Sequence, residues 1–307
     1  MINRVLIRLK VIQVVYAYYL SGSHKVETAE RELSVSLSKA YELYNILLYL
    51  LVESLLFVRQ RVNRKLRFST EPVTKAETRF MENRFLAQLE INESLTEYIK
   101  TENMEWLTTS VFPKRFSELI MESEVFNEYM EAGVFTYNAD KELCKKLYKN
   151  LLVDNEELDA LLEERSLYWN GDKAEVDSFV IRTIKNFKEG NGATQPLLPE
   201  FKSHNDVVFA ETLLRTAIEN CDEYRSLISE SSKHWDANRL ALMDVIIMQI
   251  AIAEIVTFES IPIKVTINEY VELAKYYSTP KSGGFVNGML DAIATKMYND
   301  GVITKHI

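Results

Sequence analysis

Two carboxylates near the C-terminus have a spacing that could support catalysis. Glu269 and Glu272 stand three residues apart, and such a pair could act as general acid and base. Nothing near them in the sequence supplies a nucleophile or a metal ligand, and Glu and Lys at this spacing are typical of an exposed helix face. These two residues are therefore not expected to be catalytic.

Histidine and cysteine also give no metal or nucleophile pattern. No Cys/His spacing suits a metal, and no phosphate-loop motif is present, so we expect neither an enzyme nor a cofactor. The two cysteines, Cys144 and Cys221, lie far apart in helical patterns and are expected to be buried or half-buried thiols of a reducing cytoplasm. The four histidines are isolated from one another: His24, His204, His234 and His306.

The segment GGFVNG at 283–288 holds three of the nine glycines in the chain. Apolar residues recur at helical spacing from Val286 to Met297, so a helix is expected to start near Phe285 with Gly283 and Gly284 as its approach. Free N–H groups at a helix start can hold a phosphate. Gly288 lies inside this helix, where close approach of another backbone would explain it.

The apolar periodicity of nearly the whole chain is that of helices, so the predicted fold class is all-α. No run alternates with the period of a strand, and TKAE at Thr74–Glu77 has the form of a capping box. EGNGATQPLLPE at 189–200 is interpreted as a linker. The expected helices are 4–20, 28–67, 75–100, 114–132, 141–165, 173–188, 206–231, 238–258, 265–277 and 285–298.

Charge and hydropathy limit the functions that the chain can have. The net charge is −9, yet residues 1–68 carry eleven Lys/Arg against five Glu, which allows a local basic face on an acidic protein. The longest apolar run, 46–58, is too short to span a bilayer and contains Glu53, so no membrane role is expected. The N-terminus does not have the pattern of a secretory signal.

Several ordered motifs resemble the transcription antitermination protein NusB family. They are Trp235, Arg239–Leu240, IAIAEI at 250–255, IPIKVTINEYVELAKYYS at 261–278 and GGFVNGMLDAIA at 283–294. The opening RVLIRLKVIQVVY, with Gln13 and Tyr16, resembles the first helix of the family. The resemblance covers 1–22 and 204–298. It implies a NusB-like helical bundle made of 1–22 and 204–307, with 23–203 as a helical insertion and linker.

The resemblance also implies a function. Members of the family bind boxA RNA of ribosomal-operon leaders together with NusE, a small-subunit ribosomal protein, in the RNA polymerase antitermination complex, and they carry no catalysis. The residues expected to contact single-stranded RNA here are Arg4, Arg8, Lys10, Gln13, Tyr16, Gly283, Gly284, Phe285 and Asn287. Cations suit the phosphates, Gln13 suits a base edge, and the aromatic rings suit stacking, although Tyr16 and Phe285 also fit a core.

Two departures weaken this expected surface, and rival interpretations stay open. Val5 and Leu6 stand where the family has arginines, and Gly284 stands where it often has a basic residue. The cations of 59–67 form either a second RNA contact or a solvated helix end. One rival is a helical protein–protein scaffold without RNA binding. Another is an rRNA methyltransferase with a NusB-like front, which would require a further α/β domain after the last helix.

Overall fold

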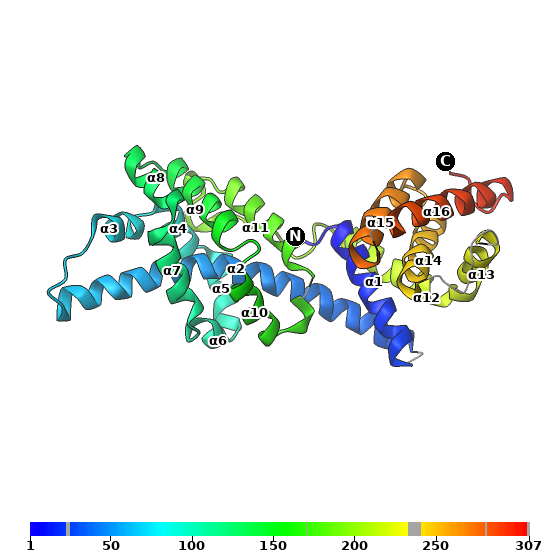
Figure 1. The fold of residues 1–307 in the computed structure, drawn as a ribbon, viewed down its shortest axis with the longest axis horizontal. Coiled ribbons are helices and arrows are strands. Elements are labelled where there is room, and N and C mark those ends of the chain that lie inside the picture. Colours follow the sequence, from blue (N-terminus) through cyan, green and yellow to red (C-terminus); the bar gives the residue numbers. More distant parts are fainter. Residues whose placement is uncertain (23–24, 170, 233–240, 280, 306–307) are drawn as a thin grey trace. The chain divides into compact units, whose positions relative to one another are not determined.

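The computed structural model describes residues 1–22, 25–169, 171–232, 241–279 and 281–305. Across these residues the secondary structure is helical, which confirms the predicted all-α class, and the one extended pairing is an isolated parallel bridge between Ile2 and Phe201. The helices form two compact units (Figure 1). The first comprises Met1 and 39–200, and the second comprises 2–38 and 201–307.

The first unit is organised along one long helix, α2 (Val26–Phe68), which enters it at Lys39. The apolar run at 46–58 lies in this helix, and most of its side chains are buried. By length and composition alone α2 could cross a membrane, but 67% of its most apolar window is buried inside the protein. A buried apolar helix is what the core of a helical domain requires, so the length of α2 is weak support for a membrane span.

The shorter helices of the first unit follow α2 in the sequence. They are α3 (Lys75–Met81), α4 (Arg84–Glu90), α5 (Glu93–Thr101), α6 (Glu105–Thr108), α7 (Phe112–Glu122), α8 (Glu124–Ala132), α9 (Tyr137–Leu151), α10 (Glu156–Arg165) and α11 (Lys173–Asn186). The capping box predicted at Thr74 is present, with the Thr74 hydroxyl accepting from the Glu77 amide and the Glu77 carboxylate accepting from the Thr74 amide.

Several helices expected to be continuous are divided by capping side chains. Asn83 Oδ1 accepts a hydrogen bond from the Leu86 amide at 2.8 Å, and Asn92 Oδ1 accepts one from the Leu95 amide at 3.1 Å. Asn155 and Ser123 begin helices in the same way. Because Asn and Ser compete for backbone N–H groups, they favour helix starts over helix interiors. The predicted helices 75–100, 114–132 and 141–165 were therefore too long.

The segment 189–200 is fixed against the first unit and is not a free linker. It begins with a short 3-10 helix, Glu189–Thr194. The Gln88 amide donates to the carbonyls of Lys188 and Gly192 at 3.0 and 2.9 Å, and the Asn92 amide donates to the carbonyl of Gln195 at 2.7 Å. These bonds satisfy backbone carbonyls that lie outside any α-helix.

The second unit contains α1 (Arg4–Ser21), α12 (His204–Glu219), α13 (Cys221–Ser231), α14 (Leu242–Thr257), α15 (Ile263–Tyr277) and α16 (Ser282–Asn299) (Figure 1). α14 is apolar on nearly every side and is buried from Ile246 to Ile255. α1, α12, α13, α15 and α16 each pack against it. Such a helix forms the centre of a bundle, and its few polar residues must find partners inside the protein.

Candidate nucleic-acid interface

Arg8 lies inside the second unit and not on its surface. Its side chain is only 4% exposed. Its Nε and one terminal nitrogen donate to the two carboxylate oxygens of Glu254, each at 2.8 Å, and the other terminal nitrogen lies 3.3 Å from Glu269. This is the bidentate geometry that guanidinium and carboxylate prefer. In this conformation Arg8 is not accessible to an RNA phosphate, so the expectation of a surface contact is corrected.

Glu254 is the polar centre of this core. Besides Arg8 it accepts hydrogen bonds from the Thr266 hydroxyl at 2.8 Å and from the Tyr270 hydroxyl at 3.1 Å. Burial opposes the charged form of Arg8, but its hydrogen bond to Glu254 and the charge of that carboxylate leave the pKa of Arg8 raised. Burial, reinforced by the Glu254 charge, raises the pKa of Tyr270 well above its ordinary value. The glutamate of the IAIAEI motif, Glu254, is therefore a structural carboxylate.

The other two cations of α1 that were expected to contact RNA, Lys10 and Arg4, differ in exposure. Lys10 is 1% exposed, so its ammonium group is not part of the surface. Arg4 is exposed, with its guanidinium 4.9 Å from the centre of the Phe209 ring. Of the three α1 cations expected to meet RNA, only Arg4 is accessible. The sequence pattern did not predict which cations are buried, because a cation that has a partner can occupy a core position.

A hydrogen bond joins the middle of α1 to the end of α15. The Gln13 amide nitrogen lies 3.4 Å from the hydroxyl of Tyr277, the last residue of α15. Tyr16, one turn further along α1, is half-buried. The chain continues from Tyr277 to the start of α16 at Ser282. Arg4 lies nine residues before Gln13, or about 14 Å along the helix.

The first glycines belong to α16 itself, which starts three residues earlier than expected. Gly283 is buried in the first turn, where a Cβ atom would come within 2.8 Å of Lys275 Cγ. The Ser282 hydroxyl donates to the buried carboxylate of Asp244 at 3.1 Å. A carboxylate already at this helix start disfavours a second anion. The expectation that the glycines form an open phosphate site is therefore wrong.

Gly284, Gly288 and Asn287 lie on the outside of α16. Among the described residues, a Cβ atom at Gly284 or at Gly288 would meet nothing within 4 Å, so close approach of another described segment does not explain Gly288. Asn287 donates to Asp291 at 3.3 Å along the exposed helix surface, and it does not cap the preceding turn. These positions leave a smooth outer face at the start of α16.

Aromatic rings occur at the same junction. Phe285 is half-buried in the first turn of α16. Tyr276 is 68% exposed and packs edge-to-face on Tyr277, with ring centres 4.9 Å apart. Sequence reasoning missed Tyr276, although its place off the apolar stripe of α15 was a usable signal. Lys281 is exposed just before Gly283 and supplies a cation where Gly284 does not.

Together these residues define a candidate surface that we call the α15–α16 junction: Gln13, Tyr16, Tyr276, Tyr277, Lys281, Gly284, Phe285 and Asn287. It offers aromatic rings, amides and one exposed lysine. Those groups suit stacking on bases and hydrogen bonding to their edges, as single-stranded RNA requires.

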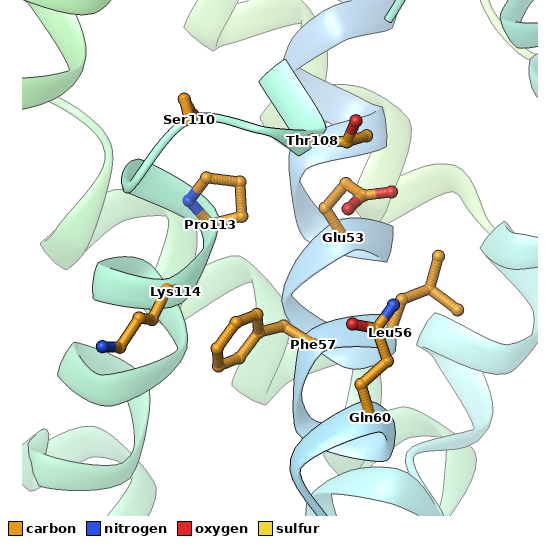
Figure 2. Close-up of a pocket in the computed structure, with 8 residues that line it drawn as sticks. All are labelled: Glu53, Leu56, Phe57, Gln60, Thr108, Ser110, Pro113 and Lys114. Carbon is orange, nitrogen blue, oxygen red and sulfur yellow. The ribbon is translucent and has the colours of Figure 1, made fainter. Parts of the chain in front are cut away.

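A separate cleft of about 210 Å³ lies in the first unit between α2 and the start of α7 (Figure 2). Its polar groups are the carboxylate of Glu53, the amide of Gln60, the hydroxyls of Thr108 and Ser110, and the ammonium of Lys114. Burial raises the pKa of Glu53. Figure 2 shows the Lys114 side chain extending away from Glu53. The groups do not converge on one point, which a catalytic site requires.

Some sequence features have no structural account. Trp235 and Arg239–Leu240 lie outside the described residues, as do His24, His234 and His306. Among the residues that the structure covers, no three His, Cys, Asp or Glu side chains are placed to hold a metal ion. Cys144 is buried, Cys221 is half-buried, and both are free thiols, as predicted.

Comparison with known proteins finds one family. The model of the NusB family matches residues 185–295, which include α12 to α15 and most of α16. No solved structure gives a significant match. The match does not extend to α1, so the resemblance of the first helix stays a prediction.

Individual relatives match the same part of the chain. The transcription antitermination protein NusB of Salinibacter ruber is 38% identical over 97 residues, or 32% of this chain and 61% of that protein. The protein of the same name from Natranaerobius thermophilus is 38% identical over 31% of this chain and 68% of its own length. The protein of the same name from Geobacter sp. strain M21 is 36% identical over 39% of this chain and 80% of its own length. The chain spans only 46% of the Chloroherpeton thalassium relative.

Proposed function

This chain belongs to the NusB family, and we propose from that premise that it is a non-catalytic RNA-binding factor of transcription antitermination. Its RNA is a boxA-like single strand in the leader of ribosomal RNA operons. Its protein partner is NusE, and the pair acts in the RNA polymerase antitermination complex in the cytoplasm. Most of the region that matches the family, from residue 201 onward, lies in the second unit, so this function is assigned to that unit.

The observation that carries the proposal is the α15–α16 junction. α1 and the start of α16 are far apart in the sequence, yet Gln13 reaches Tyr277 at the end of α15. We propose that these elements form one surface with exposed or half-exposed aromatic rings, an open helix face at Gly284 and an exposed lysine at 281. Few cations and several rings favour recognition of unpaired bases over tight binding to the phosphate backbone.

The junction residues have distinct proposed roles. Tyr276 and Phe285 stack on bases, because a ring accepts any base on its face. Gln13 hydrogen-bonds a base edge, Lys281 meets a phosphate, and Gly284 allows the strand to approach the helix closely. Arg4 is too far along α1 to share the same nucleotide and contacts the flanking backbone. Arg8 and Lys10 support this surface from within the core.

A protein–protein scaffold is the second candidate, and the burial of two α1 cations favours it. With Arg8 and Lys10 inside the second unit, the electrostatic attraction for RNA is weaker than the sequence suggested. A scaffold of this kind would bind NusE through the same unit and leave RNA to its partner. Binding to NusE that RNA leaves unchanged would favour this candidate.

The test is a titration of boxA-like RNA with the full chain, with and without NusE, at two salt concentrations. Tyr276→Ala is expected to weaken RNA binding about tenfold, because base stacking on one ring contributes about 1–3 kcal/mol. Tyr298→Ala is the matched control: it removes an exposed tyrosine near the far end of α16 and should leave the affinity unchanged. Equal affinities for both variants and the parent chain would contradict the proposed interface.

A further inference from the structure

The end of α2 carries a concentration of positive charge that the family match does not include. Five cations occur between Arg59 and Arg67 with no carboxylate among them, on a chain of net charge −9. This segment lies in the first unit, where α2 ends and the chain turns back toward α3 (Figure 1). A basic cluster on an acidic protein requires a local explanation, either partners inside the chain or a ligand outside it.

Three of the five cations are held by carboxylates of the same unit. Arg59 makes two bonds of 2.7 and 2.6 Å to the carboxylate of Glu90. Arg61 and Lys65 both contact Glu77, at 3.0 and 3.1 Å. Burial opposes the charge of Glu77, but the Thr74 amide and these two cations lower its pKa overall. The three cations on this side of α2 are therefore paired, and they join α2 to α3 and α4.

The other two cations face outward together with an aromatic ring. Arg64 and Arg67 are exposed and have no ion-pair partner among the described residues, and Phe68 is 83% exposed. At about 100° per residue these three side chains fall within an arc of about 100° on the helix. Within the part of the chain that the structure describes, nothing neutralises the charge of this face or covers its ring. We call Arg64, Arg67 and Phe68 the α2 tip.

We infer that the α2 tip is a second contact for single-stranded RNA, with Phe68 stacking on a base while Arg64 and Arg67 bind the adjacent phosphates. The inference rests on the proposed function, and it gives a role to a unit that the family match leaves almost entirely uncovered. A ring flanked by guanidinium groups is the arrangement that binds single strands without sequence preference. Sequence selection then belongs to the α15–α16 junction.

The geometry favours RNA over a membrane surface. The other exposed apolar residue here, Leu66, stands two positions before Phe68 and so lies about 160° away around the helix. An interfacial helix needs its apolar side chains on one face, and these two cannot enter a bilayer together. An acidic protein partner would need a wider apolar patch than one ring supplies.

The test compares one triple-site variant and one double-site variant of the full chain in binding to fluorescent oligouridine. Arg64→Ala with Arg67→Ala and Phe68→Ala should weaken binding at least tenfold and reduce the salt slope of log affinity by about 1.4, or about 0.7 for each phosphate contact. Lys146→Ala with Lys149→Ala is the matched control, because it removes two exposed cations at the same spacing from α9 of the same unit. Its slope should be that of the parent.

Phe68→Trp gives a direct readout that does not depend on stability, since stacking of uridine on the new indole should quench its fluorescence. Unchanged affinity of the triple variant, or no quenching, overturns the inference while a loss of binding in Tyr276→Ala keeps the proposed function. Absence of RNA binding by the parent chain overturns both. Vesicles of phosphatidylserine and phosphatidylcholine are the second probe, and tip-dependent binding to them with unchanged oligouridine binding assigns the tip to lipid instead.

Discussion

The basic residues of α1 and those at the end of α2 have similar sequence patterns but opposite environments. In the second unit Arg8 is enclosed by Glu254, Glu269 and a tyrosine ring, so its charge serves the core. In the first unit Arg64 and Arg67 are exposed, while their neighbours on α2 are paired with Glu77. A basic run in a helix therefore indicates RNA binding only after the carboxylates within reach of each cation are known.

Replacement of Arg8 is expected to have the largest effect on stability. Arg8→Ala should lower the free energy of unfolding by about 3–5 kcal/mol, because the carboxylate of Glu254 is then buried without its counter-charge. Urea denaturation followed by circular dichroism measures this change. Arg8→Met with Glu254→Met should recover part of the loss, since it removes both charges at similar volume.

The matched control for Arg8 is Arg4, the exposed arginine one turn earlier on α1. Arg4→Ala loses only a surface contact with the Phe209 ring and should cost about 0.5–1 kcal/mol. Equal stability losses for the two variants, or a stable Arg8→Ala with abolished RNA binding, would show that Arg8 acts at the surface after all.

Glu77 tests the paired side of α2. Glu77→Gln removes two ion pairs and weakens the capping box at Thr74, so a loss of about 1–2 kcal/mol is expected in thermal or urea unfolding. The folded-state pKa of Glu77 is lowered, so its stabilisation is complete above its ordinary pKa of 4.5 and is lost as pH falls through the folded value.

The pH dependence separates the charge of Glu77 from its shape. The parent chain should lose stability below about pH 4.5 more steeply than Glu77→Gln does, and the two curves should converge in acid. Glu82→Gln is a suitable control, because Glu82 is exposed and its ion pair with Arg79 is long, at 3.7 Å. Parallel curves for the parent and Glu77→Gln would contradict the role given to Glu77.

The glycines of α16 give the smallest expected effect. Gly288→Ala should raise stability by about 0.5–1 kcal/mol, because a helix-interior glycine is replaced and the new Cβ meets nothing within 4 Å. Gly283→Ala should gain less, since its Cβ would displace the Lys275 side chain. Differential scanning calorimetry compares the two variants. A destabilised Gly288→Ala would indicate a neighbour that the free chain does not reveal.

The fold class and most helices could be predicted from periodicity and the avoidance of glycine, and the capping box at Thr74 followed from four residues. The breaks at Asn83 and Asn92 could not, because the apolar pattern runs through them and only the side-chain caps decide. The order at 189–200 depends on Gln88 and Asn92, about a hundred residues away in the sequence.

The candidate site was predicted less completely than the fold. Phe285, Gln13 and Arg4 are accessible or partly accessible, but Arg8 and Lys10 are buried. The burial of Arg8 could not be predicted, because the carboxylate that it contacts lies 246 residues later in the chain. Tyr276 was missed because it lies next to the apolar stripe of α15 but on the exposed side of the helix. Periodicity identifies the face that a helix buries, but it does not identify which polar residues are paired inside that face.

Ultraviolet cross-linking of boxA-like RNA to the full chain, followed by mass spectrometry of the peptides, tests the central claim most directly. The account predicts cross-links in peptides that contain Tyr276 and Phe285, and in the peptide that ends α2 at Phe68. The peptide that contains Arg8 should carry none through that side chain. Cross-links confined to other surfaces of the chain, or none at RNA concentrations that saturate binding, would contradict the account.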